Sequence, residues 1–444
     1  MMQKKHLYYL LSLSLLIAIG PLDSLGQSLQ DNSYQSDTLR LDRSSCEAYL
    51  LQNSVRIVAE ELEIDKAMAE KWQAKLWPNP SLEIDEVNLW STPSQLGYFG
   101  EELPPIAGNF GRNLQVSMAL EQLVQTAGKR KKLIAIEEVA VEQSEAYFKD
   151  FLRELKLSFR ELLNQLEYLE NNKTLLASQF ASLSQLKNAM GKQVELGNTG
   201  KAEYVRLMAA QLELKKELFE IEEELISLEH ELALLMNLPR GTVLRLEVSD
   251  DFPELEKIST ISLGQLENEA FKNRPDLKVA MLEEKYQSNM VDYEKAQRIP
   301  DVALKVGYDR GGNFMLNFIG FGASIDLPFF DRNQGNIKRA QISQQQAQLK
   351  AQYKQSSVLG EVRTAYFSLM KEIEFYRDID HQYDAELDGL LENYTRNFSD
   401  RNISLLAYLD FLEAYLENKE ILLDTKRSIR DKLETLHSTI HGEI

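Results

Sequence analysis

Cysteine and histidine are scarce in this 444-residue sequence, which holds one cysteine, Cys46, and five histidines. One cysteine cannot form an internal disulfide, so an oxidising compartment is permitted but is not used for cross-linking. His437 and His441 have the spacing of a helical metal pair, but at the end of a helical segment this spacing is more typical of solvated surface. We therefore predict neither a metal site nor a cofactor, and no nucleophile–base pairing indicates an enzyme.

Basic residues are outnumbered by acidic ones, 50 against 69, which gives a formal net charge of −19. Binding of nucleic acid depends on basic surface, so we predict no nucleic-acid partner. The many Asp and Glu residues are more typical of hydrated helix faces than of paired catalytic carboxylates.

Long apolar runs are missing after residue 26. The first 26 residues combine two lysines, an apolar core from Leu7 to Ile19 and small residues before the predicted cleavage site, which indicates a secretory signal. The apolar core is shorter than the roughly 20 residues that a spanning helix needs. If the mature chain enters a membrane, we expect it to do so as strands.

Proline is missing between Pro105 and Pro239 and again after Pro328. Since proline breaks helices, and both windows are rich in strong helix formers with apolar residues at three- and four-residue spacing, each window predicts long packed helices. The helices predicted over 128–195 and 334–397 would each reach on the order of 100 Å. Such lengths exclude an ordinary globular core.

Each helical window has one polar interruption, at residues 195–204 and 397–406, which predicts a tight turn between antiparallel helices. The two halves of the chain also align with one another. A shift of 220 residues sets 53–84 on 273–304, a shift of 207 sets Gly128 on Gly335, and a shift of 202 matches the two turns. These matches predict an internal duplication.

The duplication divides the chain into segments, each repeat reading helix, strand, loop, strand, long helix, turn, helix. The predicted segments are a signal over 1–26, an N-terminal extension over 27–46, repeat 1 over 47–236, a connector over 237–262 and repeat 2 over 263–444.

The strands predicted over 81–90, 112–122, 301–310 and 314–327 have one apolar and one polar face. About ten residues with this alternation is the pattern of a transmembrane β-strand, although either pair alone also fits a soluble hairpin. Glu86 interrupts the alternation, so either it lies at the membrane boundary or the register shifts there.

Four strands cannot close a barrel, and an open edge in lipid leaves unpaired backbone groups that cost several kcal/mol each. The smallest outer-membrane barrels have about eight strands, so several chains must share one barrel. We predict a mainly α fold with a small β part, in which long coiled-coil-like helices form a periplasmic tube below the shared barrel.

Five segments in order along the chain resemble the TolC-like outer-membrane efflux proteins, and among them the CzcC/CusC-type outer components of heavy-metal resistance-nodulation-division pumps. They are "WPNPSLEI" (77–84), "TAGKRKKL" (126–133), "NRPDLKVA" (273–280), "LPFFDRNQGNIKRAQ" (327–341) and "RNISLLAYLDFLEAY" (401–415). The resemblance implies a homotrimer with a twelve-stranded barrel in the outer membrane of a Gram-negative bacterium and a helical tunnel in the periplasm.

The same resemblance implies a passive exit duct that conducts heavy-metal cations from a periplasmic adaptor (membrane-fusion) protein and an inner-membrane pump to the outside. A duct for drugs or for type I secreted polypeptides has the same fold, and a soluble periplasmic coiled-coil scaffold is a further alternative.

The resemblance also implies that the two helix–turn–helix tips dock the adaptor, and that Asp410 contributes to an acidic ring at the tunnel mouth. This ring is thinner than in relatives, because Ala407 stands where they often carry an acidic residue. The expected docking residues are Leu196, Gly197, Thr199, Ala202, Phe398, Asp400, Arg401, Asn402, Ile403 and Ser404.

Overall fold

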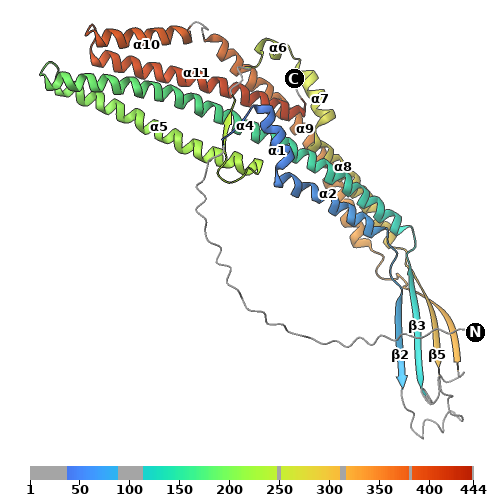
Figure 1. Cartoon of the computed structure of the whole chain (residues 1–444). Coiled ribbons are helices and arrows are strands. Elements are labelled where there is room, and N and C mark those ends of the chain that lie inside the picture. The colour runs from blue at the N-terminus through green and yellow to red at the C-terminus, as the bar shows by residue number, and fades with distance from the viewer. Residues whose placement is uncertain (1–37, 89–113, 248–251, 311–316, 380–382, 443–444) are drawn as a thin grey trace, which may run out of the picture.

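The computed structural model describes residues 38–88, 114–247, 252–310, 317–379 and 383–442. These residues form an elongated, curved body of long helices with a small sheet at one end (Figure 1). The predicted signal and the outer parts of the predicted strands, residues 89–90, 112–113 and 314–316, lie outside the described ranges.

In the first half of the chain, the described residues form two helices before the hairpin and two after it. The long helix predicted over 128–195 runs without interruption for 67 residues. Within the described ranges, no helix is both long and apolar enough to cross a membrane. The helices are α1 (Arg43–Asn53), α2 (Val55–Ala74), α4 (Lys129–Glu195) and α5 (Lys201–Met236).

The second half repeats this order after a short helix in the connector, except that three described helices instead of two follow its hairpin. The first helix of each half is broken at a matching place, because Ser54 and Arg274 both have extended backbone, with ψ of 116° and 121°. The helices are α6 (Leu255–Ser259), α7 (Leu263–Asn273), α8 (Pro275–Gln297), α9 (Gln334–Asp378), α10 (Tyr383–Ser399) and α11 (Leu405–Ile440).

The single helix predicted over 334–397 is wrong, since α9 ends at Asp378 and α10 begins at Tyr383. Ile379 has extended backbone, with φ −79° and ψ 122°, which cannot continue an α-helix. The end of α9 is held by the connector, because the ring of Tyr376 lies 5.4 Å from that of Phe252.

The four long strands form one antiparallel sheet in the order β2-β3-β5-β6. The register of β2 on β3 shifts between Asp85 and Asn88, which places an extra residue where Glu86 interrupts the sequence alternation. The strands are β2 (Ser81–Asn88), β3 (Gln115–Val124), β5 (Val302–Arg310) and β6 (Asn317–Ile325).

The described part of the predicted N-terminal extension, from Thr38 onward, is part of the folded body. Strand β1 (Thr38–Leu41) pairs in parallel with β4 (Val243–Leu246) of the connector. The following helix buries Cys46 and Leu50 completely. The prediction missed β1 because its partner lies about 200 residues away in the sequence.

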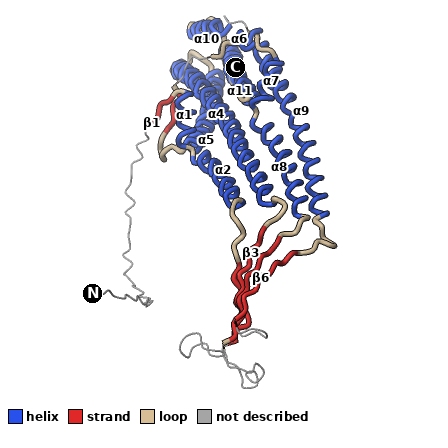
Figure 2. Tube along the Cα trace, turned by 90° about the vertical axis from the view of Figure 1, so that its right-hand side faces the viewer, coloured by secondary structure: helices blue, strands red, loops and turns tan. Residues whose placement is uncertain are grey.

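The helices lie side by side in the same lateral order as the strands (Figure 2). Near the sheet the order is α2–α4–α8–α9, and each of these helices continues into or out of one strand of the β2-β3-β5-β6 sheet. Farther from the sheet the order is α5–α4–α11–α10. The protomer is therefore a curved layer with two lateral edges, α2 and α5 on one side and α9 and α10 on the other.

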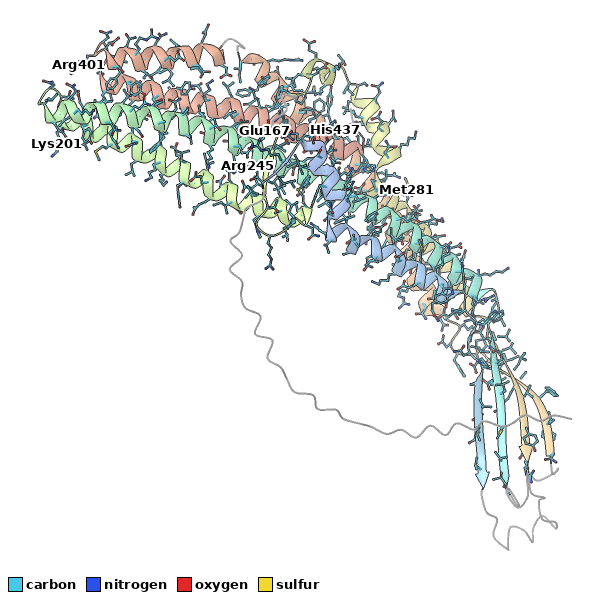
Figure 3. The ribbon with its side chains drawn as sticks, viewed as in Figure 1. Glu167, Lys201, Arg245, Met281, Arg401 and His437 are labelled. Carbon is cyan, nitrogen blue, oxygen red and sulfur yellow. The ribbon has the colours of Figure 1, made fainter. Side chains whose placement is uncertain are left out.

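Buried apolar side chains and ion pairs between neighbouring helices hold this layer together. Along α4, Phe159, Leu163 and Leu166 are at most 1% exposed, and burial of each such side chain stabilises the fold by about 1.5–3 kcal/mol. Half-way along the body, Glu167 accepts from Arg43 and Arg430, which joins α1, α4 and α11 (Figure 3).

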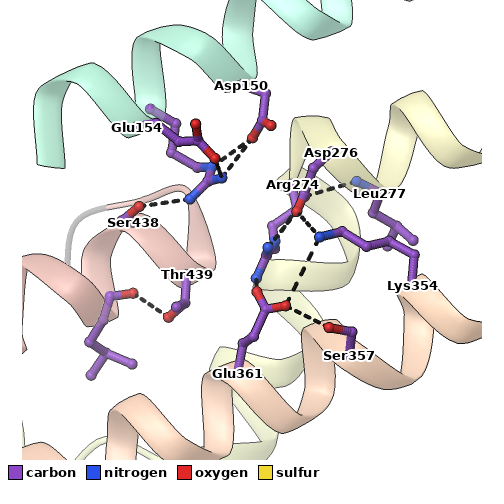
Figure 4. Close-up of polar contacts among 12 residues, drawn as sticks. Asp150, Glu154, Arg274, Asp276, Leu277, Lys354, Ser357, Glu361, Ser438 and Thr439 are labelled. Carbon is purple, nitrogen blue, oxygen red and sulfur yellow. Dashed lines mark hydrogen bonds and ion pairs between the residues drawn. The ribbon is translucent and has the colours of Figure 1, made fainter. Parts of the chain in front are cut away.

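A second ion-pair cluster surrounds Arg274, which is 3% exposed at the break between α7 and α8 (Figure 4). Arg274 bonds to Asp276 and lies 2.6 Å from Glu361 of α9, while Lys354 of α9 lies 2.6 Å from Asp276. Burial alone would raise the pKa of Asp276, but the hydrogen bonds from Arg274 and Lys354 hold it well below its usual value.

Candidate functional site

Two turns lie together at the end of the body farthest from the sheet, as the labels of Lys201 and Arg401 show (Figure 3). One joins α4 to α5 and the other joins α10 to α11. We call residues 193–201 the first tip and residues 397–405 the second tip.

The two tips have the same backbone geometry. Gly197 and Arg401 both have left-handed backbone, with φ of 73° and 61°. The amide of the following residue closes each turn, since Asn198 N–H donates to the Gln193 carbonyl and Asn402 N–H to the Asn397 carbonyl, both at 2.8 Å. This is the Schellman arrangement that ends many helices.

Matching Gly197 to Arg401 corresponds to a shift of 204 residues, so the shift of 202 used to align the turns is wrong by two. The same correction applies where α4 and α9 begin. Their left-handed caps are Gly128 and Asn333, with φ of 68° and 58°, whereas Gly335 has no left-handed backbone. The error arose because asparagine and arginine occupy positions that glycine would signal in the sequence.

One side chain joins the two tips. Gln193 Oε1 accepts from Asn198 Nδ2 at 3.0 Å and from Arg401 Nη2 at 3.2 Å. A groove of about 510 Å³ lies between the tips, with Gln193, Thr199 and Arg401 among the residues that line it. The sequence-based prediction missed Gln193 and Asn198. Asn198 directly follows Gly197, which was a visible turn signal, whereas Gln193 had no such signal.

The predicted docking residues divide into exposed and structural ones. Phe398 is stacked on Tyr408 with ring centroids 5.1 Å apart, and the Ser404 side chain accepts from the Ala407 amide, so these two shape the second tip. Thr199 and Ile403 are half-buried. The exposed ones are Ser404 and the remaining docking residues, Leu196, Gly197, Ala202, Asp400, Arg401 and Asn402, and Asp410 in α11 is exposed as well.

The sheet at the opposite end has one apolar and one polar face. Directly paired residues of neighbouring strands point to the same side, so the register assigns each face. The apolar face is exposed to an unusual degree, with Leu82 at 64% and Phe321 at 84%. Its other exposed side chains are Ile84, Met118, Leu120, Leu304, Val306, Ile319 and Ile325.

The polar face carries charged, polar and small residues, apart from Leu123 and Phe318. Lys305 Nζ lies 3.0 Å from Glu83 Oε2. This ion pair bridges β5 and β2 across β3, and Ala119 between them leaves it room. The acidic side chains of this face are Glu83, Asp85, Glu121 and Asp309.

The lateral edges of the layer carry further exposed apolar residues. On α5, Val205, Leu212, Phe219 and Ile226 repeat every seven residues and are 54–68% exposed. They lie opposite the buried stripe Leu207, Leu214, Ile221 and Leu228, because two residues correspond to about 200° on a helix. Exposed apolar residues also follow α2 (Val55, Val58, Leu62, Trp72) and α9 (Ile342, Leu349, Tyr353, Phe367).

Comparison with known proteins agrees with this architecture. Residues 266–377, which form α7 to α9, match the outer membrane efflux protein family. No curated protein sequence matches the chain significantly.

Solved structures with this fold include the CmeC outer membrane channel of Campylobacter jejuni (14% identity, 90% of this chain and 85% of that one, TM-score 0.72) and CusC (16%, 94% and 96%, 0.69). The open state of the MtrE outer membrane channel of Neisseria gonorrhoeae is also similar (15%, 90% and 88%, 0.67). The chain therefore has the same fold as these channels.

Proposed function

We propose that this chain is the outer-membrane exit duct of a tripartite efflux pump and that it works as a homotrimer. The observation that carries the proposal is the sheet: its apolar face is exposed, and the outer edges of β2 and β6 have no strand partner within the described part of the chain. In lipid such a sheet is stable only when another chain pairs with each edge.

Three copies would close the sheet without a change of strand direction. Strand β2 is antiparallel to β3, β3 to β5 and β5 to β6, so β6 of one copy runs antiparallel to β2 of the next. The apolar face would then contact lipid and the polar face would line the pore. Twelve strands exceed the minimum of about eight for outer-membrane barrels.

The exposed helical stripes support the same assembly. The stripe on α2 lies directly above the β2 edge and the stripe on α9 above the β6 edge, so both would meet in the same interface between neighbouring copies. The α5 stripe, on the same side as α2, would pack against the α10 edge. A seven-residue apolar repeat is the pattern that a coiled-coil partner buries.

We propose that the two tips dock a periplasmic adaptor protein, beyond which an inner-membrane resistance-nodulation-division pump drives transport. A groove at the free end of the body, which suits a helical partner, is lined by five of the docking residues, Thr199, Phe398, Arg401, Ile403 and Ser404. Asp410 would face the tunnel mouth. In this proposal a shared barrel would lie in the outer membrane and the helices in the periplasm, after removal of a signal over residues 1–26.

For the cargo we propose heavy-metal cations. The polar face of the sheet carries four carboxylates and one lysine, an excess of negative charge that favours cations without forming a binding site. Drugs or a secreted polypeptide are the alternative cargoes. Deletion of the gene should raise sensitivity to zinc, cobalt or copper, whereas increased sensitivity to dyes alone would support a drug duct.

Membrane insertion separates the duct from a soluble periplasmic scaffold. We expect the protein to stay with the membrane after osmotic shock, to need detergent for extraction and to change gel mobility on heating. Release by osmotic shock without detergent would support the scaffold and contradict the duct.

A further inference from the structure

The half of the sheet–helix junction formed by the α2–β2 and β3–α4 connections concentrates positive charge in a strongly acidic chain. Residues 71–80 and 125–134 together hold six basic and no acidic side chains. The first range ends α2 and leads into β2, while the second leads from β3 into α4. Both therefore lie at the level where the proposed barrel meets the periplasm.

The contacts place part of this junction beside the apolar face of the sheet. Gln122, whose side chain is on the same face as Leu120 and Leu304, donates to the Pro78 carbonyl at 3.0 Å. Trp77 precedes Pro78, is 58% exposed and stacks on the Arg130 guanidinium at 4.1 Å. An exposed tryptophan therefore lies next to the end of the apolar face that adjoins the helices. Tryptophan is enriched at this level, the membrane–water interface, in membrane proteins.

The cations of this junction are available to a ligand. Arg130 donates to the Lys75 carbonyl at 3.0 Å, which brings the end of α2 and the start of α4 together. Lys75 and Lys131 are exposed and Lys132 is half-buried. Where the structure describes the chain, neither these three lysines nor Arg130 has a carboxylate partner within ion-pair distance.

We propose that this junction, Lys75–Trp77 with Arg130–Lys132, binds the phosphate headgroups of anionic phospholipids in the leaflet that faces the helices. The inference rests on the proposed membrane position. Arg and Lys supply the donors for a phosphodiester, the indole ring occupies the headgroup level, and the acyl chains lie against Leu82 and Leu120.

The same site is next to the edge that the assembly covers. In the proposed trimer, the β6 edge of one copy adjoins the β2 edge of the next, which brings Leu327 and Phe329 close to the junction of the neighbouring chain. Both are more than 60% exposed. A bound lipid would thus contact two copies and stabilise their interface.

The test is native mass spectrometry of the detergent-solubilised full chain with phosphatidylglycerol or phosphatidylcholine. The variant combines Arg130→Gln, Lys131→Gln and Lys132→Gln. Its control combines Lys192→Gln, Lys201→Gln and Lys215→Gln, which remove the same charge from exposed positions near the first tip and along α5. Trp77→Ala tests the interfacial ring separately.

We expect the wild type and the control to retain phosphatidylglycerol over phosphatidylcholine, and the variant to bind it at least about tenfold more weakly, since each cation near an anionic surface contributes roughly fivefold. Equal retention by the variant would overturn the proposal. Displacement by inorganic phosphate would also overturn it, because it would indicate a site for free phosphate.

Insertion into vesicles of pure phosphatidylcholine distinguishes this inference from the proposed function. If the protein inserts there and forms oligomers but shows no preference for phosphatidylglycerol, only the headgroup site is wrong. If it inserts into neither kind of vesicle, the membrane duct itself is contradicted.

Discussion

Arg401 donates a hydrogen bond of 3.2 Å to Gln193 across 208 residues of sequence, and this bond joins the tips of the two halves. Arg401 holds this position with left-handed backbone, which costs an L-residue roughly 1–2 kcal/mol relative to glycine. The Gln193–Arg401 bond would have to break if the two tips of the proposed duct move apart.

Charge reversal at Arg401 should abolish efflux while the assembled protein stays in the membrane. Arg401→Glu removes the bond to Gln193 and places a carboxylate in the groove between the tips. Growth in the presence of the exported compound, with heat-modifiable mobility as the assembly check, measures both effects. Arg396→Glu, at an exposed site one turn earlier, is the control. Normal transport by Arg401→Glu would show that the docking surface lies elsewhere.

A bulky side chain at Gly197 should also abolish efflux, because it would strain the backbone of the first tip. Gly197 has φ 73°, so Gly197→Val places a β-branched residue in left-handed backbone and should destabilise the turn by about 1–3 kcal/mol. Gly200→Ala is the matched control, since Gly200 has φ −71° and open space around its Cβ position. Transport assays and limited proteolysis at the tip compare the two variants. Equal transport and equal cleavage of Gly197→Val and Gly200→Ala would contradict the prediction.

The cluster around Arg274 should make stability depend on acid. Because the pKa of Asp276 is lower in the folded protein than in the unfolded chain, its contribution is complete above the unfolded value of about 4 and is lost as the pH falls toward the folded value. Asp276→Asn removes one partner of a buried ion pair, at a cost of about 3–5 kcal/mol at pH 7.

Thermal unfolding of wild type and Asp276→Asn in detergent, measured from pH 7 to pH 3, tests this dependence. We expect the difference in melting temperature to be largest at pH 7 and to narrow below pH 4. Asp292→Asn, at an exposed site on the same helix, should show little difference at any pH. A difference in melting temperature that increased below pH 4 would contradict the proposed contribution of ionised Asp276.

The polar face of the sheet should make the pore select cations. Changing Glu121 to lysine reverses one of its four carboxylates, and the reversal potential across a planar bilayer should shift toward anion permeation. Glu63→Lys, on the exposed surface of α2, should leave selectivity nearly unchanged. An unchanged reversal potential for Glu121→Lys would indicate that this face does not line the pore.

The sequence predicted those helices and strands whose formation depends on residues close together in the chain. The absence of proline and the spacing of apolar residues gave α4 to within one residue, and the alternation of strands gave all four members of the sheet. The break after Asp378 had no such signal, because residues 378–383 contain neither proline nor glycine. The extended backbone of Ile379 depends instead on tertiary packing, which includes the contact of Tyr376 with Phe252.

The candidate site was predictable in place but not in detail. Polar residues between apolar stretches located both tips, whereas the bond of Gln193 to Arg401 depends on how the two halves stack. Likewise, alternation assigned the apolar face of the sheet and left a register shift at Glu86 as one of two alternatives. The pairing of β2 with β3 shows that shift.

The central claim is that neighbouring copies complete the sheet, and cysteine cross-linking across the β2 and β6 edges tests it directly. Ile84→Cys is combined in turn with Ile319→Cys, Phe321→Cys and Ala323→Cys. Within one chain these positions are separated by three strand spacings of about 4.8 Å, too far for a disulfide. Burial raises the pKa of the native Cys46 thiol to about 11, so it should stay unreactive.

Oxidation should therefore convert at least one pair into covalent dimers and trimers, while each single-cysteine variant gives no species larger than a dimer. The predicted result is a series of cross-linked bands on a gel in which the trimer is the largest species. If every pair stays monomeric in the membrane-extracted protein, the sheet is not shared between copies and the duct proposed here does not exist.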